Sequence, residues 1–386
     1  MSMLPPFDQA VLPAGVRARY IDGINGLRMH VLEAGTESKG RPLVLLLHGF
    51  PELAYSWRRV MVPLAAAGFH VVAPDQRGYG RTTGWSDDYD QDLRPFAMLN
   101  LARDALALTL ALGYRTAAAV VGHDFGAAVA SWCALARPDV FQRCAIMSAP
   151  FAGPPTLPFG TASGSQSHPD PSRAGAELDE ALGRLPAPRK HYQRYYSTRP
   201  ANADMMQCPE GVGAFLRAYF HHKSADWKDN HPVRLKDWSA SEMARMPTYY
   251  IMNRAETMAE TVRPHLPATA DIAACRWLPE TEMAVYAGEY QRTGFQGGLN
   301  WYRARYEAPL VAELSLFSGR SIDVPSLFVA GKSDWGVYQA PGAIETMQGQ
   351  AFTRMAGVHL VDGAGHWVQQ EQPEAVLGTL VPFCKS

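Results

Sequence analysis

The chain has 386 residues, of which 47% are hydrophobic and 19% charged, and its formal net charge is -1. A chain of this length can bury a large core, and its near-neutral charge excludes the basic field that recruits nucleic acid or an anionic membrane. No apolar run approaches the roughly eighteen residues of a spanning helix, and the start of the chain does not resemble a signal peptide. Five scattered cysteines fit a reduced compartment, so we expect a cytoplasmic protein with neither a membrane nor nucleic acid as partner.

Strand and helix signals alternate in the first part of the chain. Residues 18–33 predict a hairpin, the apolar run that starts at Leu43 predicts a buried strand, and residues 70–74 predict another strand. A helix is expected over about 99–112. This alternation is typical of a mostly parallel, doubly wound sheet.

The most informative motif follows the next strand. Residues 117–122 form a short apolar run, and residues 126–136 continue as an alanine-rich helix. Between them, G-H-D-F-G has the Gly-x-nucleophile-x-Gly pattern of a nucleophile elbow, whose glycines avoid clashes in a sharp strand-to-helix turn. The nucleophile position holds Asp124, where a serine hydrolase carries serine.

An aspartate at this position changes the chemistry that the site can perform. A serine alkoxide attacks an acyl carbon, whereas a carboxylate is suited to displacement at an sp3 carbon, such as an epoxide carbon or one that bears a halogen. The product is an alkyl ester on Asp124, which must then be hydrolysed. The rest of the chain should therefore supply oxyanion donors, a histidine base with a carboxylate behind it, and a donor for the leaving oxygen.

The loop H-G-F-P, which follows an earlier buried strand, is the candidate source of one oxyanion donor. In hydrolases of this architecture, one backbone N–H comes from the loop after the third strand and a second comes from the residue after the nucleophile. Phe50 and Phe125 would supply them here. We also expect a substrate pocket lined by Phe50, Pro51, Phe125, Trp335 and Trp367.

The alternation breaks after a strand over 143–148. A linker rich in Pro, Gly and Ser covers residues 150–169, and helical segments follow it. We therefore expect an α/β core made of residues 1–150 and 321–386, with a helical cap, or lid, over 151–320 inserted after the sixth strand. The site should lie between them, outside the carboxyl ends of the strands.

The stretch 203–276 inside this lid allows two interpretations. Much of it has helical spacing, so it can be a set of extra lid helices that pack on the core. Alternatively, these helices shape a substrate tunnel, and their Met and Tyr content suits a large or variable ligand.

The last part of the chain supplies candidates for the acid and the base. The apolar run that begins at Val324 predicts a buried strand, and Asp334 comes just past its carboxyl end. Residues 355–362 predict a last strand, and His366 follows in a glycine-rich turn, before a helix from about Glu374. The order nucleophile, acid, base is that of an α/β-hydrolase triad.

Three other carboxylates compete with Asp334 for the acid role. They are Asp323, Asp362 and Glu371. Asp334 is preferred because it follows a convincing strand in the right place, whereas Asp362 is too near His366 in an extended chain to orient its ring. His366 would take a proton from water, and Asp334 would hold its tautomer.

Taken together, these blocks resemble the epoxide hydrolases of the α/β-hydrolase superfamily over nearly the whole chain. The matching motifs are H-G-F-P-E, P-D-Q-R-G-Y-G-R, G-H-D-F-G and G-A-G-H-W. In the lid, Y-Q-R-Y-Y and G-G-L-N-W-Y-R resemble the segments that carry the family's paired tyrosines, and the resemblance assigns these to Tyr192 and Tyr302. Tyr195, Tyr196 and Tyr306 are neighbouring alternatives. The chain departs from the family at Phe125, where tryptophan is frequent.

The expected function is hydrolysis of a small-molecule epoxide to a vicinal diol through an ester on Asp124, with the lid tyrosines donating hydrogen bonds to the opening ring. A hydrolytic dehalogenase with the same nucleophile is the alternative, and a ligand-binding protein on a retired hydrolase fold is a third. A carboxylesterase is disfavoured because residue 124 is not serine. No metal and no cofactor is expected, since His221 and His222 are adjacent and no Cys/His/Asp cluster completes a site.

Overall fold

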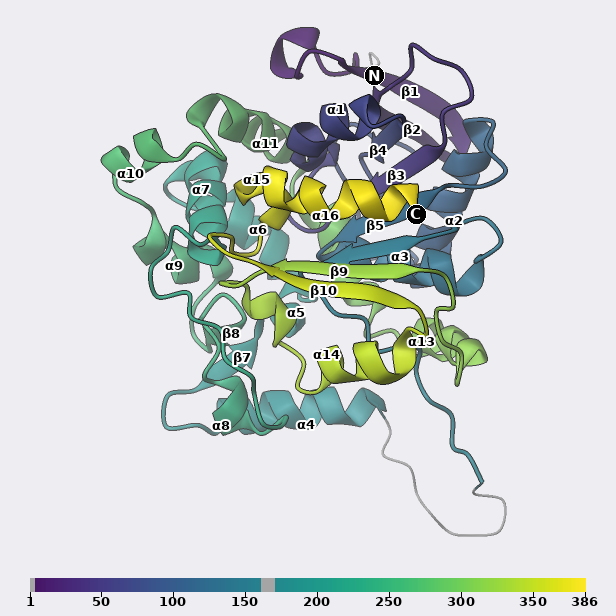
Figure 1. Cartoon of the computed structure of the whole chain (residues 1–386). Helices are drawn as coiled ribbons and strands as arrows, with labels where there is room; N and C mark the ends of the chain where they lie inside the picture. The colour runs from purple at the N-terminus through teal and green to yellow at the C-terminus, as the bar shows by residue number, and fades with distance from the viewer. Residues whose placement is uncertain (1–3, 161–170) are drawn as a thin grey trace.

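The computed structural model describes residues 4–160 and 171–386, with side chains described outside 171–174. Its centre is an eight-stranded sheet with the strand order β1-β2-β4-β3-β5-β6-β9-β10 (Figure 1). The strands are β1 (Val16–Ile24), β2 (Leu27–Ala34), β3 (Leu43–Leu47), β4 (His70–Pro74), β5 (Ala119–His123), β6 (Cys144–Met147), β9 (Ser326–Gly331) and β10 (Met355–Val361).

The sheet is parallel except at one edge. β1 pairs antiparallel with β2, and β2 pairs antiparallel with β4, whereas every pair from β4 to β10 is parallel. Every residue of β3, β5, β6 and β9 is buried. Such strands are apolar runs without alternation because helices cover both faces of a parallel sheet.

Helices of the core pack in two pairs over this sheet. The helix α1 packs against α16, and α2 packs against α3 (Figure 1). Their bounds are Arg58–Ala66 for α1, Met98–Ala111 for α2, Phe125–Ala136 for α3 and Pro373–Lys385 for α16, with the shorter α14 (Ala343–Thr346) and α15 (Val368–Glu371) near the end of the chain. The predicted fold class, an α/β-hydrolase fold with a helical region after the sixth strand, is confirmed.

The segment between β6 and β9, which we call the lid, is mostly helical. Its helices are α4 (Pro171–Gly183), α5 (Tyr192–Tyr196), α6 (Pro200–Met206), α7 (Gly211–Lys223), α8 (Ala240–Met243), α9 (Met258–Val262), α10 (Thr269–Ala274), α11 (Glu280–Thr293), α12 (Gln296–Ala304) and α13 (Ala308–Leu314). The predicted linker falls partly on residues 161–170, which lie outside the described residues. The division into core and lid domains stays a prediction.

One part of the lid differs from the helical spacing that we expected. Ile251–Asn253 is a strand, β8, which pairs antiparallel with β7 (Arg189–His191) in a separate two-stranded sheet. A three-residue strand has too few positions to display its own periodicity, and its partner lies about sixty residues earlier in the chain, so sequence pattern favours helix wrongly here.

Hydrogen bonds between buried groups attach the lid to the core. The Trp301 indole donates to the Arg77 carbonyl over 2.8 Å, and the Tyr290 hydroxyl donates to the Glu52 carbonyl over 3.1 Å. Arg58, which is 2% exposed, donates to Glu282 on α11 over 2.5 Å. Among the described residues, each helix is either too short or too polar to cross a membrane.

Candidate active site

Asp124 lies at the turn between β5 and α3 in a strained backbone conformation. Its φ is 53° and its ψ is -120°, and residues other than glycine rarely adopt these backbone angles. The turn is possible because its neighbours lack side chains: a Cβ on Gly122 would lie 2.1 Å from the Gly126 carbonyl oxygen, and a Cβ on Gly126 would lie 2.2 Å from that of Leu47. These glycines let the elbow present the Asp124 carboxylate at the end of the sheet.

Asp124 is 8% exposed, and its carboxylate contacts the H-G-F-P loop. The backbone N–H of Phe50 donates to its Oδ1 over 3.0 Å. Phe125 is the first residue of α3, where backbone N–H groups have no partner inside the helix. Burial opposes ionisation of Asp124, but contact with His366 and the nearby charge of Lys223 hold the pKa of its carboxyl well below the usual range. Asp124 is therefore an ionised carboxylate at neutral pH.

The structure brings His366 and Asp334 together beside Asp124. His366 Nδ1 lies 3.1 Å from Asp334 Oδ1, and His366 Nε2 lies 3.3 Å from Asp124 Oδ2. Both partners of this pair are nearly inaccessible, at 1% for His366 and 2% for Asp334. Asp334 Oδ1 also accepts the backbone N–H of Gly336 over 2.7 Å, which fixes the carboxylate.

This arrangement leaves one ring nitrogen of His366 able to accept a proton. A carboxylate at Nδ1 selects the tautomer that carries its proton there, and Nε2 then has a lone pair. Although Nε2 lies near Asp124, it has no aligned hydrogen-bond partner among the described residues.

The three rival carboxylates are held elsewhere. Asp362 pairs with Lys332 over 2.6 Å, and Asp323 accepts the Thr353 hydroxyl over 2.9 Å. Glu371 accepts the backbone N–H groups of Gly365 and Trp367, each over 2.9 Å. Glu371 thus holds the loop on either side of His366 without contacting the imidazole ring.

Tyr192 and Tyr302 both line the same cavity as Asp124. Their rings lie 6.0 Å apart between centroids, and Tyr302 also packs edge-on against Phe125 at 5.1 Å. The Tyr192 hydroxyl lies 3.4 Å from Gln339 Oε1 and 3.0 Å from Gln193 Nε2. Burial raises the pKa of both phenols well above the usual value, and the Asp124 charge acts in the same direction.

The alternative lid tyrosines point to other partners. The Tyr195 hydroxyl donates to Asp204 over 2.7 Å, and the Tyr196 hydroxyl donates to that of Tyr219 over 3.3 Å. Neither Tyr195 nor Tyr196 is among the residues that line the cavity. Tyr306 does line it, but it packs under Arg194, whose guanidinium carbon is 4.0 Å from the ring centroid.

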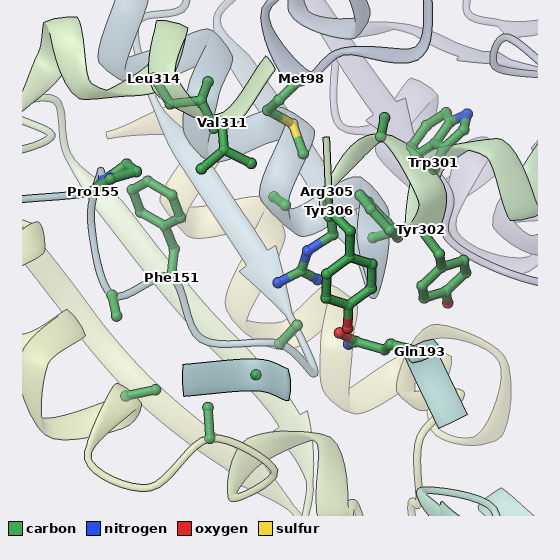
Figure 2. A pocket seen from close by; sticks show the side chains of 18 of the residues that line it. Met98, Phe151, Pro155, Gln193, Trp301, Tyr302, Arg305, Tyr306, Val311 and Leu314 are labelled. Carbon is green, nitrogen blue, oxygen red and sulfur yellow. The ribbon is translucent and has the colours of Figure 1, made fainter. Parts of the chain in front are cut away.

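The cavity has a volume of about 950 Å³ and opens between the elbow and the lid (Figure 2). Phe125 lines it, whereas Phe50, Pro51, Trp335 and Trp367 are buried outside its lining. Phe50 lies behind Tyr302, with ring centroids 5.5 Å apart. Of the stretch 203–276, Trp238 alone contributes to the lining, so the helices there do not form the wall of this cavity.

Sequence reasoning missed a second buried ion pair beside the triad. Glu52 and His123 are both 0% exposed, and His123 Nδ1 lies 2.5 Å from Glu52 Oε2. His123 Nε2 lies 2.7 Å from the His366 carbonyl oxygen, which only accepts hydrogen bonds. Burial alone would lower the pKa of His123, but the Glu52 carboxylate raises it, so we assign His123 as an imidazolium that holds the backbone of His366.

Lys223, the last residue of α7, is a second group that sequence reasoning missed. It is 3% exposed, and its ammonium lies 5.0 Å from the Tyr250 ring centroid and 5.4 Å from that of Trp367. Burial lowers its pKa, whereas the carboxylates of Asp124, Asp334 and Glu52 raise it. A fully buried lysine is rare. The only signal for it is the set of aromatic rings that surround the ammonium, and these come from distant segments, so the sequence could not indicate it.

Among the described residues, there is no cluster of three or more His, Cys, Asp or Glu side chains that could hold a metal ion. The site therefore consists of ionisable and phenolic side chains with backbone donors.

Comparison with known proteins gives consistent matches. Residues 42–206 match a family model described as alpha/beta hydrolase fold. Epoxide hydrolase A of Mycobacterium tuberculosis is 33% identical over 95% of this chain and 96% of its own length. Among solved structures, an epoxide hydrolase from an endophytic Streptomyces has a TM-score of 0.75 and 29% identity, over 97% of this chain and 96% of that one. Epoxide hydrolase A from Mycobacterium thermoresistibile has a TM-score of 0.72 and 31% identity, over 96% and 98%.

Proposed function

This chain belongs to the epoxide hydrolase family of the α/β-hydrolase fold, and from that premise we propose that it converts an epoxide and water to a vicinal diol through an ester on Asp124. The observation that carries this proposal is that Asp124 at the elbow and the two lid phenols of Tyr192 and Tyr302 line one cavity. That pairing suits attack at a neutral sp3 carbon whose leaving group is an oxygen.

In the first half-reaction, Asp124 Oδ2 attacks an epoxide carbon and the ring carbon–oxygen bond breaks. Oδ1 is already held by the Phe50 N–H, which leaves Oδ2 as the attacking atom. Tyr192 and Tyr302 stabilise the developing alkoxide, and one of them transfers a proton to it. The enzyme then carries an alkyl ester and a tyrosinate, which recovers its proton from solvent.

In the second half-reaction, water attacks the Asp124 ester carbon while His366 Nε2 takes its proton. The oxyanion forms on Oδ1, where the N–H groups of Phe50 and Phe125 stabilise it. Asp334 stabilises the imidazolium that His366 becomes. Collapse of the intermediate releases the diol, whose oxygen takes the proton from His366. The Asp124 carboxylic acid that remains then loses its proton to solvent.

This mechanism transfers an oxygen of the enzyme to the product. In a single turnover in 18O-labelled water with enzyme in excess, we expect a largely unlabelled diol and a label on the peptide that contains Asp124. Mass spectrometry of both species measures the outcome. A labelled diol with an unlabelled peptide would mean that water attacks the epoxide directly and would overturn the covalent mechanism.

A hydrolytic dehalogenase remains the alternative because it shares the nucleophile, acid and base. Such an enzyme needs N–H donors for a halide, for which indoles are suited. The two residues that supply the backbone donors are Phe50 and Phe125, and their side chains offer no N–H. The Trp335 indole N–H has no partner among the described residues, but Trp335 does not line the cavity.

A further inference from the structure

The last turn of α7 carries one member of a stacked pair of histidines. The rings of His222 and His265 lie 3.5 Å apart between centroids, with 19° between their planes. His265 belongs to a short 3-10 helix, Arg263–His265, that packs against α7. Trp227 and Tyr249 meet the His222 ring edge-on, with centroids at 4.3 and 4.7 Å. Aromatic rings therefore enclose the His222 imidazole.

The buried ring of His222 has no polar partner. It is 1% exposed, and both of its ring nitrogens lack a hydrogen bond to the described residues. A neutral imidazole already leaves one N–H and one lone pair unpaired here, and protonation would add a second unpaired N–H and a charge. The stack therefore favours uncharged imidazoles.

The charged groups around the stack do not offset this cost. They come from α7, the loop after it and α10, and they are Arg217, His221, Lys223, Asp226, Lys228, Asp229 and Asp271. Burial lowers the pKa of His222 to about 2, and the neighbours that act on this ring, His265 among them, are cationic or become cationic and act in the same direction. Burial also lowers the pKa of His265, although the Asp229 carboxylate opposes it.

The segment that carries His265 is loosely attached to α7. We call residues 263–275 the flap. Its two short helices, Arg263–His265 and α10, contain no buried residue, and Figure 1 shows α10 at the periphery of the lid. A second cavity, of about 440 Å³, is lined by Phe220 and His221 of α7 and by Asp271 of the flap. Few buried contacts are typical of an element that opens locally.

The end of α7 that the stack covers also holds the loop of His366. The backbone N–H of His366 donates to the Lys223 carbonyl over 2.9 Å, and the Trp367 indole donates to the Phe220 carbonyl over 2.8 Å. Both acceptors lie in the last turn of α7, beside His222. Loss of the stack would therefore loosen the turn that positions the proposed base.

We propose that the His222–His265 stack is an acid-sensitive latch, which closes the flap on α7 at neutral pH and releases it, together with the loop of His366, at acidic pH. Its effect on turnover rests on the proposed function. A free imidazole takes a proton from solvent near about pH 6.5. Because the pKa is lower in the closed state, that state loses stability as the pH falls below about 6.5. Each imidazole makes opening about tenfold more favourable per pH unit, and the pair about a hundredfold.

Hydrogen exchange measures this opening without turnover. Peptides covering residues 215–224 and the flap are followed between about pH 7.5 and about pH 5, with the intrinsic pH dependence of exchange removed. We expect wild-type protection to fall by about tenfold to a hundredfold per pH unit below about pH 6.5. His222→Phe and His265→Phe each keep an aromatic ring and remove one proton site, so each should reduce this fall, and the double variant should abolish it. His231→Phe, which removes an exposed histidine of the lid, should behave as the wild type.

His265→Phe keeps the test available if the larger ring is not accommodated at position 222, because His265 is only partly buried. Exchange in residues 363–368 and the rate of diol formation then show whether opening reaches the site. Protonation of a single base lowers a rate by at most about tenfold per pH unit, so the latch should make the wild-type fall steeper than that. The double variant should show the shallower slope and a nearly unchanged rate at neutral pH.

The outcomes separate the latch from the proposed function. Wild-type protection that stays constant with pH, or that falls equally in the double variant, would overturn the latch. Acid-dependent opening that the double variant lacks, in a chain that hydrolyses no epoxide, would support the latch and contradict the proposed function. Equal steepness of turnover in the wild type and the double variant would overturn the connection to the loop of His366.

Discussion

We propose that His366 acts on water and not on Asp124. Asp124 is already ionised, so its attack needs no base. We expect His366→Gln to alkylate Asp124 and then stall, because hydrolysis of the ester loses its proton acceptor, a contribution of about 100-fold to 10,000-fold. Intact-mass measurement after mixing with an epoxide should show enzyme plus substrate, where the wild type shows free enzyme. Binding of substrate without any adduct would mean that His366 is not the water-activating base.

The lid phenols should work as acids over an unusually wide pH range. Burial raises the pKa of Tyr192 and Tyr302, so both remain protonated donors above the point where a free phenol, with a pKa of about 10, ionises. We expect the alkylation rate, measured by stopped flow, to show no loss from tyrosine ionisation between about pH 7 and about pH 10. An absorbance titration that compares the wild type with Tyr192→Phe and Tyr302→Phe checks directly whether either phenol ionises in this range.

Removing either hydroxyl should slow alkylation and leave ester hydrolysis nearly unchanged. Tyr192→Phe and Tyr302→Phe each remove one donor with little change in volume, and the double variant should be far slower than either. Tyr195→Phe is the matched control, since that hydroxyl binds Asp204. An equal loss for an epoxide and a matched haloalkane would contradict a role for these phenols in opening an epoxide.

Sequence pattern alone was enough to select candidate residues that lie in a turn directly after a recognisable strand. Asp124 follows a recognisable strand in a glycine-flanked turn, and His366 follows the last strand, so pattern suffices to find both, and the structure brings them within 3.3 Å. The Glu52–His123 pair could not be predicted in this way because its members lie 71 residues apart and meet only through folding. Apolar pattern also does not distinguish a cavity wall from solid core, which is why Phe50 and Trp367 were expected in the lining.

At the level of elements, Glu33 on β2 ties the first two strands together. It is 0% exposed, and its carboxylate accepts hydrogen bonds from Arg19 over 2.7 and 2.8 Å. Burial opposes ionisation, but the His70 imidazole, whose Nε2 lies 3.4 Å from Oε1, and the hydrogen-bonded Arg19 lower the pKa of Glu33 from 4.5 to about 2. Because the folded pKa is the lower one, this stabilisation is complete above the unfolded pKa and is lost as the pH falls toward the folded value.

We therefore expect Glu33 to contribute up to about 3 kcal/mol at neutral pH. Glu33→Gln should lower the free energy of unfolding at pH 7, and the gap from the wild type should close between about pH 4.5 and about pH 2. Urea unfolding at a series of pH values measures this difference. Exposed Glu313→Gln is the control and should show no comparable gap; a gap for Glu33→Gln that is independent of pH would contradict the ion-pair explanation.

At the level of the whole molecule, buried contacts join lid and core. Arg58 contacts Gln370 in the core over 2.7 Å, and it contacts the Trp277 carbonyl and Glu282 in the lid. We expect lid and core to unfold in one transition, with hydrogen exchange in α7 and β5 sharing a denaturant midpoint. A lid that exchanges at lower denaturant than β5 would contradict this coupling.

Breaking that contact should destabilise both parts equally. Arg58→Met should reduce the free energy of unfolding by about 3 kcal/mol, because it leaves the partners of a buried cation unpaired. Arg59→Met is the matched control: Arg59 also contacts Glu282, over 3.1 Å, but is partly exposed, so its loss should cost about 1 kcal/mol or less.

The hydrogen bonds between α7 and the loop that carries His366 limit how the lid of such an enzyme can be exchanged. The N–H of His366 donates to the Lys223 carbonyl over 2.9 Å, and the indole of the next residue donates to the Phe220 carbonyl over 2.8 Å. The proposed general base is therefore anchored by part of the lid, the segment that an engineer would exchange to alter selectivity. A chimera that borrows a foreign lid must inherit the last turn of α7 with it, and the natural unit of recombination is the lid together with the loop that it holds.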